Sequence, residues 1–461
     1  MSTQPGDADD QRPGHRAEGT RQPAKPMHSL VVCRALTDGR LSVAGSVQSP
    51  AAILIEHTPS ATPRTRLRVL AIGRLEHVRA HPAASAARTV DAGDSVVLPG
   101  LINAHTHLDL TVIGPRPHDP AEGFSSWVQQ IRTHRKTDAD DIRESVEAGV
   151  RLSRAGGVAA VGDIAGAVNG AASLVAADAL RDSGLPGVSF IEFFAIGPTA
   201  HERWSRAADL VRSQPSRHQG DHRIGLQPHA PNTVAPAAYR AAASLAGERG
   251  LPLMTHLAES PEEHEFIADA VGPQRTLLES LGLWDDETAA DFGRGRSPVE
   301  HLAEILDATN AIAVHVNQCS DSDLELLARS KITVVYCPRA SAYFGVEQQF
   351  GPHRYRDMIA AGIRVAVGTD SIVNLPAGTD RLSPIDEIRY LHDRDQAEPD
   401  TLIQMATING AAAVGFGEAA ACLAPESRPM ALASVRVADA EIDKPSASVL
   451  ASRAVPKILF E

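Results

Sequence analysis

Short, continuous runs of apolar residues recur along most of the chain, with amphipathic stretches between them. The runs that we expect to form strands span residues 96–103, 158–163, 188–194, 224–228, 253–256, 311–316, 332–337 and 363–369. Helical periodicity occurs at residues 139–154, 236–248, 321–329 and 355–361, and again at 384–392 and 400–414. Because continuous apolar strands are typical of sheets covered on both faces, this alternation predicts an α/β fold, a (β/α)8 TIM barrel over residues 98–416.

The two ends of the chain differ from this alternating region. Residues 1–27 contain almost no large apolar side chain, so we expect a disordered tail there. Residues 28–97 carry short apolar runs between turn residues, which predicts a small β unit. Residues 417–461 again show short apolar segments without helical period, and we expect them to pair with the N-terminal unit.

The amino-acid composition argues against a nucleic-acid-binding protein and against a membrane-spanning one. The 461 residues include 44 Lys and Arg against 57 Asp and Glu, a formal net charge of −13. This balance argues against nucleic-acid binding, because phosphate contacts need clustered basic residues. No apolar stretch approaches the ~20 residues that span a bilayer, and no secretory signal precedes the first apolar run. The four cysteines form no CxxC pair, so we expect a cytoplasmic protein in a reducing compartment.

Histidines stand at the ends of several predicted strands. His105 and His107 flank Thr106, so in a strand both imidazoles project to one face, as half of a metal site. Two surface histidines in a loop are the alternative. His256 ends another strand and Glu259 follows three residues later, where it can handle protons beside a metal. Alternatively, Glu259 belongs to the acidic first turn of a helix.

Three further polar residues follow the same rule. His229 closes the strand at 224–228, His315 lies in the last half of the strand at 311–316, and Asp370 ends the strand at 363–369. Taken singly, each is more simply a core histidine or a helix N-cap. A parallel barrel, however, brings the carboxyl ends of all its strands to one mouth. The whole set therefore predicts a metal site and an enzyme.

These motifs, in this order, resemble the amidohydrolase superfamily, and within it the mononuclear deaminase and chlorohydrolase-like branch that includes methylthioadenosine/adenosylhomocysteine and aminodeoxyfutalosine deaminases. The matching segments are PGLINAHTHLDL, AGGVAAVGDI, PHAPNT, THLAES, AVHVNQCSDSDLELLA, YCPRASAYFG, AAGIRVAVGTDS and ATINGAAAVG. The resemblance implies a TIM barrel with a small β-sandwich built from residues 28–97 and 417–461. The family's usual PGxxAD turn is missing near the C-terminus, where the chain reads RPMAL.

The resemblance also implies roles for the strand-end residues. One divalent metal, with zinc as the first expectation and iron as the alternative, would be bound by His105, His107, His256 and Asp370. Glu259 would shuttle protons, His315 would orient the metal-bound water, and Asp370 would also accept the proton of that water. His229 and Trp127 would contact the substrate. Binuclear members bridge two metals with a carboxylated lysine, and the chain has no lysine between Lys136 and Lys331, which favours a single metal.

The expected reaction follows from the chemistry of such a metal. A bound cation lowers the pKa of its water from 15.7 toward about 7, which supplies hydroxide at neutral pH. We expect this hydroxide to deaminate a purine- or nucleoside-like heterocycle and release ammonia, with hydrolysis of a cyclic amide or a C–Cl bond as the alternative. The PCxxC motif of cytidine deaminases and the GxSxG elbow of serine hydrolases are both absent.

The substrate itself is a small molecule of open identity. The segment 124–131, which includes Trp127, resembles the substrate loop of adenosine-related deaminases, but the glutamate that ribose-binding members carry after the tryptophan is missing. Arg132, Arg135 and Arg339 are candidates to receive an anionic group, with solvated surface arginines as the alternative. Dimers are common among relatives, so a homodimer is one candidate assembly.

Overall fold

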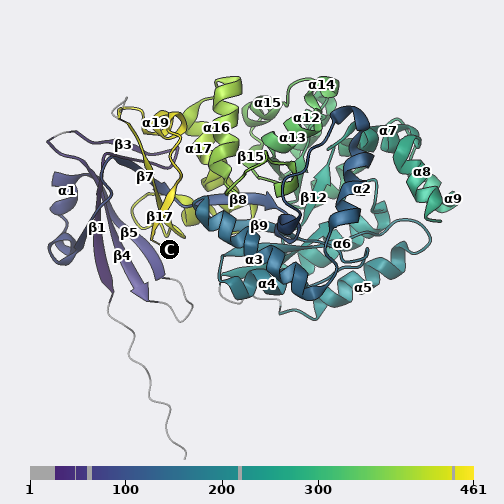
Figure 1. Cartoon of the computed structure of the whole chain (residues 1–461), viewed down its shortest axis with the longest axis horizontal. Helices are drawn as coiled ribbons and strands as arrows, with labels where there is room; N and C mark the ends of the chain where they lie inside the picture. Colours follow the sequence, from purple (N-terminus) through teal and green to yellow (C-terminus); the bar gives the residue numbers. More distant parts are fainter. Residues whose placement is uncertain (1–25, 47, 60–64, 216–220, 439–441, 461) are drawn as a thin grey trace, which may run out of the picture.

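The structure is a computed structural model that describes residues 26–46, 48–59, 65–215, 221–438 and 442–460. The tail predicted for residues 1–27 lies outside the described residues, apart from its last two positions. Two mixed sheets from the ends of the chain lie at one side of the molecule, and the parallel strands with their helices make up the rest (Figure 1).

Two four-stranded sheets hold the strands that were expected for the barrel. Their orders are β11-β10-β9-β8 and β12-β13-β14-β15, and every pairing within them is parallel. The strands are β8 (Leu101–Thr106), β9 (Val158–Ala165), β10 (Gly187–Phe193), β11 (His222–Pro228), β12 (Met254–Leu257), β13 (Ile312–His315), β14 (Thr333–Tyr336) and β15 (Arg364–Val367). Parallel bridges pair Thr106 with Asp370 and Leu226 with Leu253, so the outer strands of the two sheets meet. The predicted α/β class with parallel strands is confirmed.

Helices follow these strands and pack on the sheets (Figure 1). The α-helices are α2 (Phe124–His134), α3 (Ala139–Ala155), α4 (Val175–Ser183), α5 (Ala200–Arg212), α6 (Pro236–Arg249), α7 (Pro261–Asp269), α8 (Gly272–Ser280), α9 (Asp286–Ala289), α10 (Pro298–His301), α11 (Ala303–Ala308), α12 (Asp321–Arg329), α13 (Pro338–Phe344), α14 (Glu347–Phe350), α15 (Tyr355–Ala360), α16 (Pro384–Asp395), α17 (Pro399–Ala406) and α18 (Ile408–Ala413). The 3₁₀ turns are η1 (Pro82–Ala86), η2 (Leu108–Ile113), η3 (Pro120–Glu122), η4 (Ile372–Asn374) and η5 (Glu418–Ala421). Many α-helices begin with proline at the first position, where the missing N–H has no helical partner to lose.

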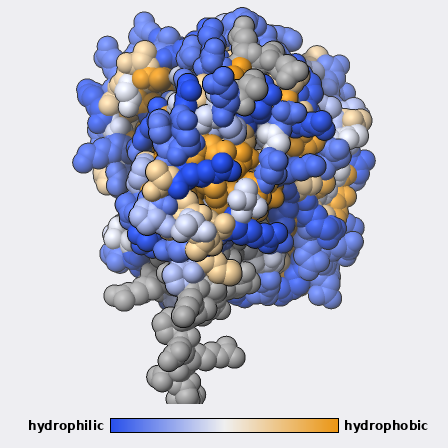
Figure 2. Space-filling view, turned by 90° about the vertical axis from the view of Figure 1, so that its left-hand side faces the viewer, coloured by the Kyte–Doolittle hydropathy of each residue, from blue (hydrophilic) through white to orange (hydrophobic). Residues whose placement is uncertain are grey.

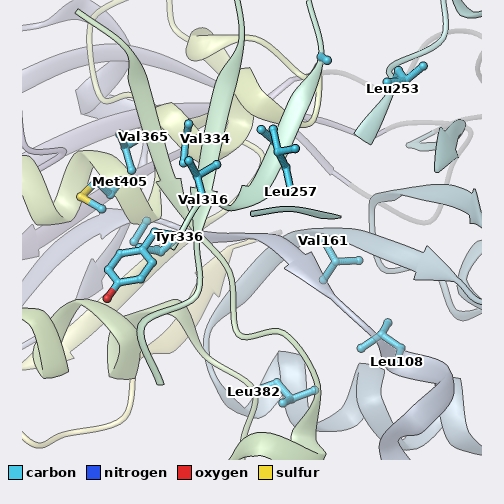
Figure 3. Close-up of a cluster of buried hydrophobic side chains, with 14 of the residues drawn as sticks. Leu108, Val161, Leu253, Leu257, Val316, Val334, Tyr336, Val365, Leu382 and Met405 are labelled. Atoms are coloured by element: carbon cyan, nitrogen blue, oxygen red, sulfur yellow. The ribbon is translucent and has the colours of Figure 1, made fainter. Parts of the chain in front are cut away.

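Alternate residues of the parallel strands enter two separate apolar clusters. In β14, Val334 belongs to the larger cluster, which lies between strands and helices, and Val335 belongs to the smaller one. Figure 3 shows part of the larger cluster, with strand residues such as Val334 and Val365 near Met405 of α17. Because both faces of each strand are buried, the strands read as continuous apolar runs rather than as alternating ones.

The run at 96–103, expected to be one strand, is two. β7 (Ser95–Pro99) and β8 are separated at Gly100 and belong to different sheets. A Cβ atom at Gly100 would lie 2.6 Å from the Cβ of Ala159 and 2.8 Å from that of Ala431, so only glycine fits where the chain crosses between sheets. Hydrophobic pattern alone could not show this break, because both halves are equally apolar.

The ends of the chain form two further sheets. A five-stranded sheet has the order β17-β16-β7-β2-β3 and a four-stranded sheet the order β5-β4-β1-β6. The strands are β1 (Met27–Cys33), β2 (Ala35–Thr37), β3 (Ser42–Ala44), β4 (Ala51–Pro59), β5 (Thr65–Arg74), β6 (Arg88–Asp91), β16 (Leu432–Arg436) and β17 (Lys457–Phe460), with helix α1 (Leu75–Arg79) after β5. β16 pairs antiparallel with β7, so the N- and C-terminal segments share one sheet. Side chains from both sheets, including Val31, Ile53, Val97 and Leu432, form one buried apolar cluster.

The C-terminal segment also contains helices, and here the prediction was wrong. α19 (Pro445–Ala451) is a short helix whose Ser446, Val449 and Leu450 are buried, so tertiary contacts select it where periodicity gave no signal.

The helix predicted at 400–414 is broken at Thr407, which has φ −130° and ψ −93° and whose hydroxyl donates to the carbonyl of Ile403 at 2.7 Å.

The outer face of the terminal sheets is mostly hydrophilic, with apolar side chains gathered near its centre (Figure 2). Within the described ranges, no helix has the length and hydropathy required to cross a membrane.

Candidate active site

The polar residues predicted at strand ends lie together at the carboxyl ends of the parallel strands. Each can offer one nitrogen or oxygen atom, and within each of four groups these atoms lie within 4.8 Å of one another. The groups are His105 with His256 and His315, His105 with His107 and Asp370, Glu192 with His229 and His256, and Glu259 with His315 and Asp370. Residues that are more than 250 positions apart in the sequence thus share one site.

The imidazole rings pack closely around the Asp370 carboxylate. The Oδ1 atom of Asp370 is 3.5 Å from the Nε2 atom of His107 and 3.7 Å from the Nε2 atom of His105. The ring centroids of His105 and His256 are 5.1 Å apart, and those of His107 and His256 are 5.5 Å apart. The His105 side chain is fully buried and that of Asp370 is 5% exposed, so this polar cluster has little contact with bulk water.

Several contacts fix the orientation of these side chains. The Nδ1 atom of His105 lies 3.4 Å from the sulfur of Met254, and the Nδ1 atom of His256 lies 3.1 Å from the carbonyl oxygen of His229. The side-chain amide of Asn374 donates to Oδ2 of Asp370 at 2.7 Å. For both imidazoles, contacts on Nδ1 direct Nε2 toward the cluster, which is the arrangement that orients a histidine ligand.

Glu259 stands just before helix α7. Ser260 caps that helix by accepting the N–H of Glu263, so Glu259 is not in the first helical turn, the alternative considered from the sequence. The Glu263 carboxylate accepts the backbone N–H of Ala258 at 2.9 Å and that of Glu259 at 2.8 Å. The Oε1 atom of Glu259 lies 3.5 Å from the Nε2 atom of His315.

The backbone is strained at the same strand ends. His315 has φ 74° and Asp370 has φ 54°, in the left-handed region that non-glycine residues seldom adopt. The Asp370 N–H donates to the carbonyl of His105 at 3.1 Å, and the ring of His353 meets the carbonyl of His315 at 2.8 Å. Strain of this kind persists where surrounding contacts hold it, and it is concentrated at functional sites.

Burial sets the charge state of these groups. It lowers the pKa of His315 to about 3 and lowers the pKa values of His107 and His256 well below the usual 6.5, so these imidazoles are neutral at pH 7. Burial, helped by the charge of Asp370, raises the pKa of Glu259 well above its usual 4.5. For Asp370, burial favours a higher pKa, but the approach of His105, His107 and His315 outweighs it and lowers the pKa.

Of the two residues predicted to contact substrate, His229 borders this cluster, and Trp127 belongs to an aromatic group on α2 and α13. The ring centroid of His229 is 5.1 Å from that of His256 and 4.6 Å from that of Phe194. Trp127 of α2 packs against Phe124 and Phe344, with ring centroids 5.2 Å away in both cases. The Nε1 atom of Trp127 is buried and has no hydrogen-bond partner among the described residues. An unpaired donor of this kind is available for a ligand.

The three arginines considered as binding sites for an anionic group differ in their exposure and in their ion pairs. Arg132 is exposed. Arg135 is 19% exposed and donates to the Asp109 carboxylate at 2.5 Å, while Arg339 is 16% exposed and donates to Glu387 at 2.6 Å. The solvated-surface interpretation was therefore wrong for Arg135 and Arg339, because each guanidinium is drawn inward by a buried carboxylate.

Acidic residues at two other strand ends were not predicted from the sequence. Asp163 in β9 is fully buried, and burial raises its pKa well above 3.8. Glu192 in β10 is 3% exposed and accepts the N–H of Ala167 at 2.9 Å. The signal that exposed the histidines, a polar residue near the carboxyl end of an apolar strand, was present in both strands.

The donor set fits a single divalent metal ion. Neutral imidazoles and an ionised carboxylate are the ligands that zinc commonly takes in proteins. The Nε2 atom of His105 is buried and lacks a hydrogen-bond partner in the described structure, which would be costly unless another ligand satisfies it. His107, His256 and Asp370 offer the other donor atoms near it.

The chain is similar to known proteins over most of its length. The sequence pattern of the amidohydrolase family matches residues 96–429. This chain belongs to the amidohydrolase family. The predicted resemblance is confirmed, and so is the expectation of a hydrolase that acts on carbon–nitrogen bonds.

Similar proteins agree with this assignment. The amidohydrolase is 28% identical over 342 residues to 5-methylthioadenosine/S-adenosylhomocysteine deaminase of Haloarcula marismortui, covering 71% of this chain and 70% of that protein. It is 28% identical over 416 residues to aminodeoxyfutalosine deaminase of Deinococcus radiodurans, covering 84% and 85%. Among solved structures, Helicobacter pylori aminofutalosine deaminase in complex with methylthio-coformycin superposes with a TM-score of 0.71 at 17% identity, covering 94% and 98%. A mutant atrazine chlorohydrolase TrzN of Arthrobacter aurescens, complexed with zinc and atraton, gives a TM-score of 0.69 at 18% identity, covering 94% and 95%. At these identities the structural matches show the fold alone.

Proposed function

We propose that this amidohydrolase is a metal-dependent deaminase that hydrolyses the exocyclic amine of a purine-like nucleoside and releases ammonia. One observation carries the proposal: three imidazoles, the Asp370 carboxylate and the Glu259 carboxyl group, which are groups able to bind a metal or to carry a proton, lie together in one buried site. The curated relatives that match this chain over most of its length support the reaction class, because both are deaminases by name.

His105, His107, His256 and Asp370 are the residues that would hold one divalent ion, zinc in the first instance and iron as the alternative. When bound, such an ion supplies water of lowered pKa and positive charge for an addition to an electron-poor carbon. The neutral state of His107 and His256 favours this role, because an imidazole must lose its proton before it can bind a metal.

Glu259 is the proposed acid and base. Burial raises the pKa of Glu259, which favours the protonated carboxyl group, and this proton can pass to a ring nitrogen or to the departing amine. His315, 3.5 Å away, can hydrogen-bond to an attacking oxygen and to the Glu259 carboxyl. Asp370, the other ionisable partner in this group, stays ionised and can accept a proton from water.

His229 and Trp127 are the proposed contacts with the rest of the substrate. The Nδ1 atom of His229 is paired with the Thr233 hydroxyl at 2.8 Å, which leaves Nε2 for the ligand. The indole N–H of Trp127 adds a second donor from α2. An aromatic wall made with Phe124 and Phe344 suits a flat heterocycle.

The architecture that we propose for this enzyme is a closed (β/α)8 barrel over residues 98–416. The bridges Thr106–Asp370 and Leu226–Leu253 support closure on both sides of the two parallel sheets. We further propose that segments 28–97 and 417–461 form a β-sandwich, since the two terminal sheets share an apolar cluster. A cytoplasmic location and a homodimeric assembly remain predictions from the sequence.

Ammonia release against a panel of purine nucleosides, pterins and triazines tests the function. The purified chain should carry about one equivalent of metal by elemental analysis and release ammonia from a purine nucleoside. Chloride release from a chlorinated triazine without any deamination would instead support the C–Cl alternative. A well-folded preparation that binds no metal would refute the proposal.

A further inference from the structure

A buried ionic cluster lies beside the proposed metal site and takes no part in the mechanism above. Arg135, at the end of α2, donates to Oδ2 of Asp109 at 2.5 Å, and its Nη1 atom lies 3.9 Å from Oε2 of Glu192. Both carboxylate side chains are 4% exposed. The Oδ1 atom of Asp109 is buried and has no hydrogen-bond partner among the described residues.

The neighbouring backbone is shaped around this cluster. A Cβ atom at Gly166, which follows β9, would clash with Nη2 of Arg135 and lie 2.6 Å from Oδ2 of Asp109. Only glycine leaves room for the guanidinium at this position. The ion pair is therefore built into the carboxyl end of the parallel sheet rather than resting on its surface.

Glu192 links this cluster to the proposed substrate contacts. It lies near the carboxyl end of β10, and one of its carboxylate oxygens is within 4.8 Å of ring nitrogens of both His229 and His256. A substrate that reaches His229 must therefore approach Glu192. The charged groups around Glu192 are Arg135 and, through it, Asp109, and the buried Asp163 carboxyl group lies near Asp109.

In this cluster the acidic groups outnumber the basic ones, because a single guanidinium faces two carboxylates. Arg135 already donates to Asp109, and Glu192 lies close to the same guanidinium. A substrate carboxylate or phosphate would have to displace a carboxylate that is already in place, and would face like charge. A hydroxyl or ammonium group would instead find an acceptor in Glu192 or in the unpaired oxygen of Asp109.

We infer that Glu192, Asp109 and Arg135 form a subsite that receives a hydrogen-bond-donating or cationic substituent of the substrate and disfavours an anionic one. The inference rests on the proposed deaminase function, and it specifies the part of the nucleoside that does not react. It also argues against Arg135 as the receiver of an anionic group, which was one of the two alternatives left open by the sequence.

Three probes with the same purine and ribose ring but different charge test the subsite. They are 5′-amino-5′-deoxyadenosine, adenosine and adenosine-5′-carboxylic acid. Ammonia release by the metal-loaded full chain gives kcat/KM, and calorimetric titration of the Glu259→Gln variant gives Kd without turnover. We expect the amine to be preferred over the carboxylate by about tenfold or more in both measurements.

The two measurements separate the subsite from the proposed reaction. Ammonia release with equal or better use of the carboxylate overturns the subsite and leaves the deaminase function standing. The expected order of Kd without ammonia from any probe supports the subsite and refutes the deaminase function. Failure of all three probes to bind overturns both.

Substitutions at the subsite should change the ratio of kcat/KM for the amine probe to kcat/KM for the carboxylate probe. Removing a carboxylate should lower this ratio, and removing the guanidinium should raise it. Glu192→Gln removes one negative charge and Asp109→Asn frees the guanidinium, so each should lower the ratio about tenfold. Arg135→Gln leaves two carboxylates unopposed and should raise it. Glu387→Gln is the matched control, because it removes the carboxylate of another buried arginine pair, whose acidic side chain is 1% exposed. A merely structural role predicts that all four variants change the overall rate while the ratio stays constant.

Discussion

The carboxyl ends of the parallel strands and the cluster between the terminal sheets are both buried, yet they bury opposite kinds of side chain. Between the terminal sheets, Val31, Ile53 and Val97 are fully buried in an apolar cluster. Charged residues of that unit form ion pairs at the surface. One example is the pair between Arg68 and Glu426, in which the Glu426 side chain is 70% exposed. At the strand ends, the His105 side chain is equally inaccessible and that of Asp370 is 5% exposed.

The comparison indicates that the terminal unit contributes stability, whereas the strand-end site contributes reactive groups. Burying a polar group costs free energy unless a partner compensates, so a purely structural region excludes such groups. The strand-end site gathers them, shifts their pKa values and holds His315 and Asp370 at positive φ. The same degree of burial therefore stabilises one region and tunes proton transfer in the other.

The largest effect should come from removing a metal ligand. His256→Ala should abolish metal binding and reduce turnover on the order of a thousandfold or more, because one of few donor atoms is lost. Elemental analysis and ammonia release measure the two consequences. His77→Ala, in the terminal unit with a 77% exposed side chain, is the control and should change neither.

Replacing the proposed proton carrier should separate metal binding from turnover. Glu259→Gln keeps the size of the side chain but removes its proton chemistry, so metal content should stay near one equivalent while kcat falls about 10²–10⁴-fold. A fully active variant would exclude Glu259 from proton transfer.

A substitution that leaves a cavity in the apolar cluster between the terminal sheets should lower stability without affecting metal binding. Ile53→Ala should lower the free energy of unfolding by about 2–5 kcal/mol, because the site is fully buried and cannot readily collapse. Metal content and KM of the folded protein should not change. Thermal unfolding measured beside elemental analysis checks this, and loss of metal from folded protein would contradict the separation of the two regions.

The smallest effect concerns Glu263, which holds the backbone of Glu259. Burial raises the pKa of Glu263 to about 7, above its usual 4.5. A carboxyl whose pKa rises on folding binds its proton more tightly in the folded state, so its contribution to stability is complete below about pH 4.5 and is lost as the pH rises toward 7. The stability advantage of the natural chain over Glu263→Gln should therefore shrink between pH 5 and pH 7.5. Unfolding curves at several pH values measure it, and a constant difference would contradict the shifted pKa.

Much of the parallel region was readable from the sequence, because its physical signals are local. Strands buried on both faces appear as continuous apolar runs, and a polar residue at the end of such a run is conspicuous. That is how His229, His256 and Asp370 were found. The residues that orient them, such as Met254 and Asn374, carried no comparable signal, since one lies within an apolar run and the other lies in the 3₁₀ turn η4, beyond the end of a strand.

Other features depended on contacts between distant segments. Gly100 divides an uninterrupted apolar run because Ala159 and Ala431 crowd it, and α19 forms where no periodicity predicted a helix. The burial of Arg135 depends on Asp109, Glu192 and Gly166, which lie on different elements. None of these partners is near in the sequence.

Which residues are able to do chemistry, and that they stand at the ends of buried strands, could be read from the chain alone, because hydrophobic pattern and residue type are properties of the sequence. Which of them meet, which are neutral or charged, and which arginine is already neutralised depend on the folded molecule. Distances, desolvation and the balance of buried charge arise between segments that are far apart in the chain, so they exist only once it is folded.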